Sequence, residues 1–437
     1  GLYTNTTGVN NTALGTYALQ LNTTANNNTG IGYNALYANT TGVSSVAVGS
    51  LCLDANTTGN YNTAVGRSAL GDNTTGSSNT GLGYNSLGAN STGSYNVAIG
   101  MYVLDANTTA DNNTGVGYLA LGANTTGTNN VAVGSSALDA NTTGTRSTAV
   151  GHNALSTITT ESDCTAVGHD SLPVTTGQRN TAIGSFSGGL NSTGQYNTFL
   201  GYAAGYGSTT TSNNTGVGYL ALYSNQAENN TGVGSGSLQT NTSGASSTAV
   251  GKNALYSNTT ASENVAIGYQ SMDANTTGAE NTAVGTDSLG ALTTGHRNTA
   301  IGRQAGYTMT TGENNTFLGY ETGEALTTGD NNTIGGYRAG LRITTADSNT
   351  AYGGYAGDHI TTGNSNTCIG IAAGRDITTG AGNTCLGNDS GRSNSPFTVS
   401  TESNRVVVGD NGITNAYIKV AWTVTSDERD KTDIQDI

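Results

Sequence analysis

The sequence has little of what fibrous, membrane and linker proteins are built from. Of its 437 residues, two are prolines and one is a tryptophan, and only 10% are charged. Glycine, at 65 residues, is too sparse for collagen, and the scarcity of proline excludes a polyproline linker. No apolar run approaches the ~20 residues of a membrane-spanning helix. We therefore expect no membrane insertion.

Positive charge is scarce as well. Fourteen lysines and arginines stand against 28 acidic residues, which gives a formal net charge of −14. A nucleic-acid partner would require a basic face, so we expect none. The sequence also lacks a phosphate-binding glycine loop, a His-Glu-x-x-His helix and a nucleophile elbow. We expect no cofactor, and no enzyme beyond the self-cleavage considered below.

Histidine and cysteine are each present four times. His152 and His169 lie seventeen residues apart, and their rings could stack, but two ligands do not make a metal site. We therefore expect solvated surface there and no metal. Cys368 and Cys385 have the same spacing, and we expect buried free thiols rather than a disulfide, because in-register stacking suits that bond poorly.

A strict period of seventeen residues dominates the chain. NTAVGRSALGDNTTGSS is followed at once by NTGLGYNSLGANSTGSY, and the glycine that closes NTAVG returns in about 23 copies up to Gly387, with two copies one residue short. Such a period indicates a solenoid rather than several globular domains. We number each repeat from its first Asn, so that Asn62 is position 1 and Gly66 is position 5.

The pattern within a repeat predicts one β-coil per copy. Position 4 is aliphatic, position 8 is small and position 9 is Leu in most early copies, whereas positions 12–15 read Asn-Thr-Thr-Gly, which is a turn signal. No helical period fits this spacing. We predict an all-β parallel solenoid, or β-roll, over residues 1–391, with positions 4 and 9 inside, as at Val116 and Leu121.

A coupled change near residue 300 supports this interpretation. Position 9 becomes Gly from Gly306 onward, and in five consecutive copies position 12 becomes apolar: Met309, Leu326, Ile343, Ile360 and Ile377. Because protein interiors are close-packed, volume lost at one position is refilled from another. We infer that positions 9 and 12 face a common interior.

Tyrosine recurs at position 6 and is the main candidate for surface recognition. These residues are Tyr33, Tyr84, Tyr118, Tyr202, Tyr219, Tyr269, Tyr320 and Tyr337. Rings on a polar wall suit stacking on a sugar, so a cell-surface glycan or receptor is one partner to consider, but the pattern favours a ladder of rings that merely covers the backbone. The Asn-Thr-Thr turns also match the N-glycosylation acceptor pattern.

The C-terminal region departs from the repeat. The β-branched runs predict a β-rich neck over residues 392–425. The stretch SDERDKTDI at 426–434 resembles the start of the endosialidase-type intramolecular chaperone domain found at the ends of phage tail spikes and tail fibres. That resemblance implies a domain that trimerises the fibre and then cuts itself off just before Ser426. It also implies that Ser426 and Lys431 form the Ser–Lys dyad that performs this self-cleavage. Residues 426–437 would be its truncated beginning.

The repeats themselves are similar to arrays that precede such chaperone domains, and to the heads of trimeric autotransporter adhesins. The resemblance implies a parallel β-roll in a homotrimer. Solenoids with a meagre private core also gain from burying a second face. We therefore expect an extracellular, structural and adhesive homotrimeric fibre shaft, most consistent with a viral tail fibre that contributes to host attachment; the alternative is a bacterial surface adhesin or extracellular filament.

Overall fold

The computed structural model describes residues 1–415 and contains strands but no helix within them. Each strand has three residues and occupies positions 2–4 of a repeat. The strands are β1 (Thr12–Leu14), β2 (Thr29–Ile31), β3 (Val46–Val48), β4 (Thr63–Val65), β5 (Thr80–Leu82), β6 (Val97–Ile99), β7 (Thr114–Val116), β8 (Val131–Val133), β9 (Thr148–Val150), β10 (Thr165–Val167), β11 (Thr181–Ile183), β12 (Thr198–Leu200), β13 (Thr215–Val217), β14 (Thr231–Val233), β15 (Thr248–Val250), β16 (Val265–Ile267), β17 (Thr282–Val284), β18 (Thr299–Ile301), β19 (Thr316–Leu318), β20 (Thr333–Gly335), β21 (Thr350–Tyr352), β22 (Thr367–Ile369), β23 (Thr384–Leu386) and β24 (Val406–Val408).

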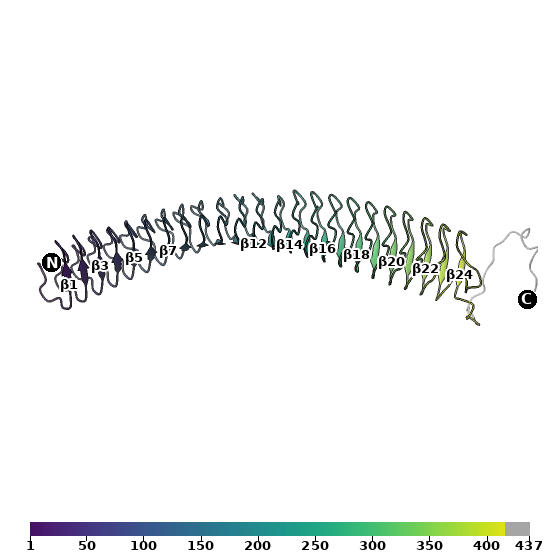
Figure 1. Cartoon of the computed structure of the whole chain (residues 1–437), viewed down its shortest axis with the longest axis horizontal. Coiled ribbons are helices and arrows are strands. Elements are labelled where there is room, and N and C mark those ends of the chain that lie inside the picture. Colours follow the sequence, from purple (N-terminus) through teal and green to yellow (C-terminus); the bar gives the residue numbers. More distant parts are fainter. Residues whose placement is uncertain (416–437) are drawn as a thin grey trace, which may run out of the picture.

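The predicted parallel β-solenoid is confirmed. Each strand pairs in parallel and in register with the strand one coil away, as Thr63 with Thr80 and Val65 with Leu82. The coils stack into a single, gently curved rod with the N-terminus at one end (Figure 1). Strand β24, from the region predicted as a neck, pairs with β23 and extends the same sheet. Among residues 1–415, nothing helical has the length and apolarity to cross a membrane.

The strands show which side chains enter the rod, and here one prediction is wrong. Successive strand residues point to opposite faces. Position 3, which is Ala, Gly, Phe, Ile or Cys in β2 to β23, is buried in each of these strands, whereas position 4, which is aliphatic in all of them but β20 and β21, points outward; Leu82 and Ile301 are both 45% exposed. Val116 is only half-buried. The narrow coil has room for a small residue at position 3, so the larger aliphatic side chain is left on the outer face.

The glycine at position 5 is required by both its backbone conformation and its neighbours. Gly66 has a φ of 134°, which L side chains rarely adopt. A Cβ built on Gly66 would collide with the carbonyl oxygen of Gly83 in the next coil. A spine of glycines therefore runs along the rod, and this explains why the period is marked by glycine.

The interior lies between positions 3, 8, 9 and 12, as predicted for the last two. Leu121 and Ile343 are fully buried in one continuous hydrophobic core. Position 9 has a left-handed backbone, with φ of 54° at Leu121 and 61° at Gly306, so replacing Leu by Gly there also removes strain. Phe317 occupies the space beside Gly306, and a Cβ on that glycine would press against its ring.

The asparagines at position 12 are not exposed turn residues but a buried amide ladder. The Nδ2 of Asn107 donates to Oδ1 of Asn90 at 2.8 Å, and Oδ1 of Asn107 accepts from Nδ2 of Asn124 at 3.0 Å. The ladder stops where an apolar residue replaces Asn, and the last Oδ1, on Asn141, then has no partner. Seven asparagines at position 12 that match the glycosylation pattern are buried in the rod: Asn22, Asn39, Asn56, Asn73, Asn107, Asn124 and Asn141.

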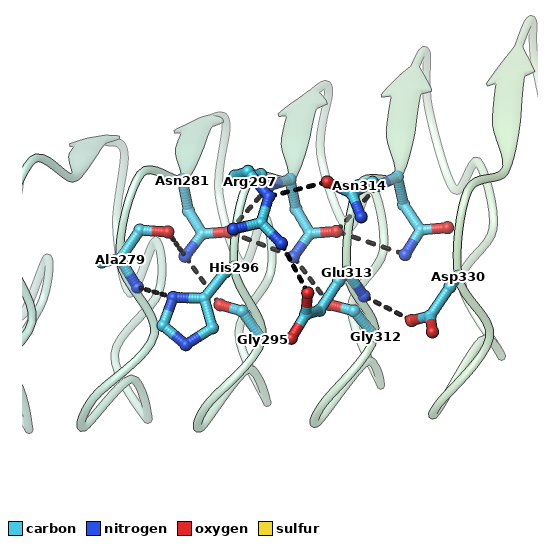
Figure 2. A network of polar contacts seen from close by, with 11 residues as sticks. Ala279, Asn281, Gly295, His296, Arg297, Gly312, Glu313, Asn314 and Asp330 are labelled. Carbon is cyan, nitrogen blue, oxygen red and sulfur yellow. Dashed lines mark hydrogen bonds and ion pairs between the residues drawn. The ribbon is translucent and has the colours of Figure 1, made fainter.

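A second amide ladder replaces the first towards the C-terminus. Position 1 supplies it: the Nδ2 of Asn298 donates to Oδ1 of Asn281 at 3.0 Å, beyond the point at which position 12 becomes apolar (Figure 2). Position 16 adds side chains that accept from the backbone of the coil before, as Oδ1 of Asp330 does from the amide of Glu313 at 2.7 Å. Most polar groups of the repeat therefore hold neighbouring coils together.

Candidate functional site

A groove runs along the rod between positions 7 and 10. It exists because positions 8 and 9 turn into the core, with left-handed backbone at positions 7 and 9, such as Ser68 (φ 55°) and Leu70 (φ 51°). The side chains at positions 7 and 10 therefore form the two edges of the groove, and side chains at positions 6 and 11 add to its lining. Four hollows along the described rod are lined entirely from these positions.

The groove is aromatic in two segments. The larger hollow, of about 510 Å³, is lined by Phe186, Tyr202, Ala203, Tyr206, Leu220 and Tyr223. A similar hollow of about 500 Å³ near the N-terminus is lined by Tyr17, Gln20, Tyr33, Asn34 and Tyr37. Both volumes fall within the range of small-ligand sites, roughly 300–1,000 Å³.

The groove is acidic in two other segments. Asp54, Asp72 and Asp105 line a hollow of about 310 Å³, and Asp273 and Asp287 line one of about 220 Å³. Partial burial raises the pKa of Asp54, and the negative charge of Asp72 raises it further. Burial likewise raises the pKa of Asp105 and Asp273. The same backbone groove thus carries different chemistry along its length.

The tyrosines predicted for surface recognition all point outward, with between 37% and 56% of their surface exposed: Tyr33, Tyr84, Tyr118, Tyr202, Tyr219, Tyr269, Tyr320 and Tyr337. They do not form one ladder. Direct stacking on the next coil joins Tyr202 to Tyr219 and Tyr320 to Tyr337. Sequence reasoning missed the position 10 edge, where Tyr206 and Tyr223 form a third stacked tyrosine pair, with ring centroids 5.4 Å apart. The sequence signal that could have revealed this edge is the recurrence of Tyr at position 10 of two consecutive repeats.

The two neighbouring histidines stack, as predicted. The rings of His152 and His169 are 5.3 Å apart and nearly parallel, and both are exposed. The sequence analysis did not consider Asp170, whose Oδ2 lies 3.2 Å from Nδ1 of His169. These three side chains place potential ligand atoms within 4.8 Å of one another. Elsewhere, Nδ1 of His296 accepts from the backbone amide of Ala279 (Figure 2).

The four cysteines, Cys52, Cys164, Cys368 and Cys385, are buried free thiols, as predicted. Burial raises the pKa of Cys52 to about 12, so its thiol stays protonated and unreactive at neutral pH. Cys368 and Cys385 are register partners in β22 and β23. The contact with Cys385 and burial both raise the pKa of Cys368. The same contact lowers the pKa of Cys385. All four cysteines pack within the core.

The dyad implied by the C-terminal resemblance, Ser426 and Lys431, lies outside residues 1–415. Comparison of the chain with models of known protein families gives no match, and no curated protein matches it. The resemblance to chaperone-bearing fibres and to adhesin heads therefore stays a prediction.

Proposed function

We propose that the chain is the shaft of a homotrimeric, extracellular fibre, most consistent with a viral tail fibre that contributes to host attachment. The observation that supports this best is the row of aliphatic side chains at position 4. It follows the outer face of the strands from Leu14 to Val408, and Ile99, Val133, Ile183 and Ile267 in it are each at least 37% exposed. Contiguous apolar surface of this extent marks an interaction face.

Burying this row would stabilise an assembly substantially. Removing a half-exposed Ile or Leu from water contributes about 1–2 kcal/mol, and the row supplies one such side chain in nearly every coil. Two further outward aliphatic residues, Val46 and Val131 at position 2, widen the same face. A three-fold contact along the rod would cover these side chains.

The assembly is tested by mass and shape. Light scattering should give three times the chain mass of 43.9 kDa, and electron microscopy should show rods of ~105 Å, from about 22 steps of ~4.8 Å. The double variant Ile99→Asp/Val133→Asp should fall to single chains. Thr109→Asp/Thr143→Asp, which places the same charges on exposed residues of the same coils, should remain assembled. A monodisperse single chain in the parent would overturn the proposal.

Localisation separates the tail fibre from its alternative, a bacterial surface adhesin or extracellular filament. Gold-labelled antibody against the rod should decorate virion tails if the proposal holds. Labelling of a cell envelope would favour the adhesin. If the full gene also encodes the chaperone domain, Ser426→Ala should leave an uncut trimer of higher mass, and Lys431→Ala should behave alike.

A further inference from the structure

One stretch of the rod carries a continuous row of rings. His152, His169, Phe186, Tyr202 and Tyr219 occupy positions 6 or 7 of five consecutive coils. Neighbouring ring centroids are 5.3, 5.3, 6.0 and 5.7 Å apart along this row. The row is parallel to the rod axis, so it presents a platform for an extended ligand rather than for a single compact one.

A second row faces the first across the groove. Tyr206 and Tyr223, at position 10, stack with an interplanar angle of 8°. The hollow of about 510 Å³ lies between them and the edge formed by Phe186, Tyr202 and Leu220. The ligand would therefore lie along the groove with rings on both sides.

The electrostatics of this stretch are unusual for so acidic a chain. Residues 180–227 contain no Asp, Glu, Lys, Arg or His, although the chain as a whole has a net charge of −14. A stacking platform for single-stranded nucleic acid requires basic residues to neutralise the phosphates, and this groove has none. An acidic polysaccharide would meet the same lack of counter-charge. The ligand that fits is uncharged.

We propose that the segment of the groove between Phe186 and Tyr223 binds a neutral polysaccharide as an extended chain. The C–H groups of a sugar ring can pack against the exposed parts of these aromatic rings, while tyrosine hydroxyls bond to its hydroxyl groups. This inference rests on the proposed role of the fibre in attachment, and it adds the site and the class of ligand.

Binding of the full chain to immobilised neutral glucans, mannans and galactans tests the inference, with alginate, heparin and single-stranded DNA as charged probes. At least one neutral polysaccharide should bind, and its affinity is then measured by calorimetry. Tyr202→Ala/Tyr219→Ala and Tyr206→Ala/Tyr223→Ala should each weaken that affinity at least about tenfold. Tyr61→Ala/Tyr95→Ala is the matched control, because these rings are 63% and 64% exposed at position 17 and should leave it unchanged.

Several results would overturn the inference. Binding of none of the neutral polysaccharides, binding of a charged probe instead, or an equal loss in the control variant would each do so. Sedimentation of the same samples covers a further case: if Tyr202→Ala/Tyr219→Ala dissociates an assembled parent, the row is a subunit contact and not a glycan site. Rods that assemble but bind no polysaccharide would refute this inference alone, whereas a parent that never assembles refutes the proposed fibre.

Discussion

The amide ladder at position 12 predicts that one substitution has different costs at different places. Asn107 lies mid-ladder, whereas Asn275 ends the second run of the ladder and its Oδ1 has no partner. Replacing either by Ala removes a bond to the Asn one coil before, namely Asn90 or Asn258, and also a bond to a carbonyl three residues on, at 3.1 and 2.9 Å respectively. These losses are matched in the two variants.

The difference lies on the other side of each residue. Asn107→Ala also removes the acceptor of Asn124, which costs about 1 kcal/mol. Both substitutions leave the buried Oδ1 of the preceding Asn, Asn90 or Asn258, without its donor, which costs about 1–3 kcal/mol. In Asn275→Ala this cost is offset, because the substitution also removes the Oδ1 of Asn275, which was already unpaired. We therefore expect Asn107→Ala to be destabilised by about 2–4 kcal/mol more than Asn275→Ala.

Hydrogen exchange is the suitable assay, because solenoids open locally and global unfolding need not be two-state. In each variant, the exchange rate of the amides around the substituted residue is divided by the rate of the same amides in the parent. This acceleration should be about 30- to 700-fold larger for Asn107→Ala than for Asn275→Ala. Equal acceleration in the two variants would refute the reasoning, since it would mean that continuity of the ladder contributes nothing.

Three further outcomes are expected. Leu121→Asp should abolish the protection of its coil, because it places an unpaired charge in the core, whereas Val116→Asp should leave the coil folded; equal circular dichroism melts for the two would contradict this. Asp54→Asn and Asp105→Asn should raise the free energy of unfolding at pH 7, because the fold raises both pKa values and so disfavours the charged carboxylates. Water screens both groups, so each gain should be under about 1 kcal/mol. Below pH 3.8, the ordinary aspartate pKa, chemical denaturation should show no gain, because the carboxyl groups are then protonated in both states. EDTA should leave the melting temperature unchanged, because the ladders need no metal; a drop would point to an ion at His152 and His169.

Much of the architecture follows from the sequence because the period is so regular. The glycine that returns every seventeen residues predicts one coil per repeat. In the later copies Leu is lost at position 9 while an apolar residue appears at position 12, as at Gly340 and Ile343, and this indicates that the two positions share one interior. That inference needed only the constancy of packed volume. The confirmed burial of both residues shows that compensating changes between copies report contacts within one chain.

The errors have a common physical cause. Position 4 is a large apolar residue in every strand from β1 to β23 except β20, and the prediction that it lies inside rested on its hydrophobicity alone. A coil this narrow excludes it, and the better signal was position 3, which is never polar in β1 to β23. Likewise, Asn73 was read as a turn residue, although identical amides one coil apart can satisfy each other when buried.

The groove could not be foreseen for a different reason. It depends on left-handed backbone at residues such as Leu70 and Tyr102, where sequence rules expect glycine or asparagine. The stacked neighbours impose this conformation, so it is a property of the assembled rod and not of one repeat. Once it is known, the exposed edges at positions 7 and 10 follow directly.

Near-identical coils make the register of the solenoid ambiguous during folding. If folding joined a coil to the wrong neighbour, the glycine spine and the amide ladders would be satisfied as well as before. Phe199 reduces this degeneracy, because its ring lies between Gly188 and Gly205, where a Cβ on either glycine would press against it, whereas most of the preceding coils have Leu at position 9. Phe317 lies in the same way between Gly306 and Gly323, the first two of six consecutive coils with Gly at position 9, so it disfavours slippage only towards the coils that have Leu there. The two phenylalanines thus act as registration marks, because a slip that places either ring beside a Leu at position 9 produces a steric clash.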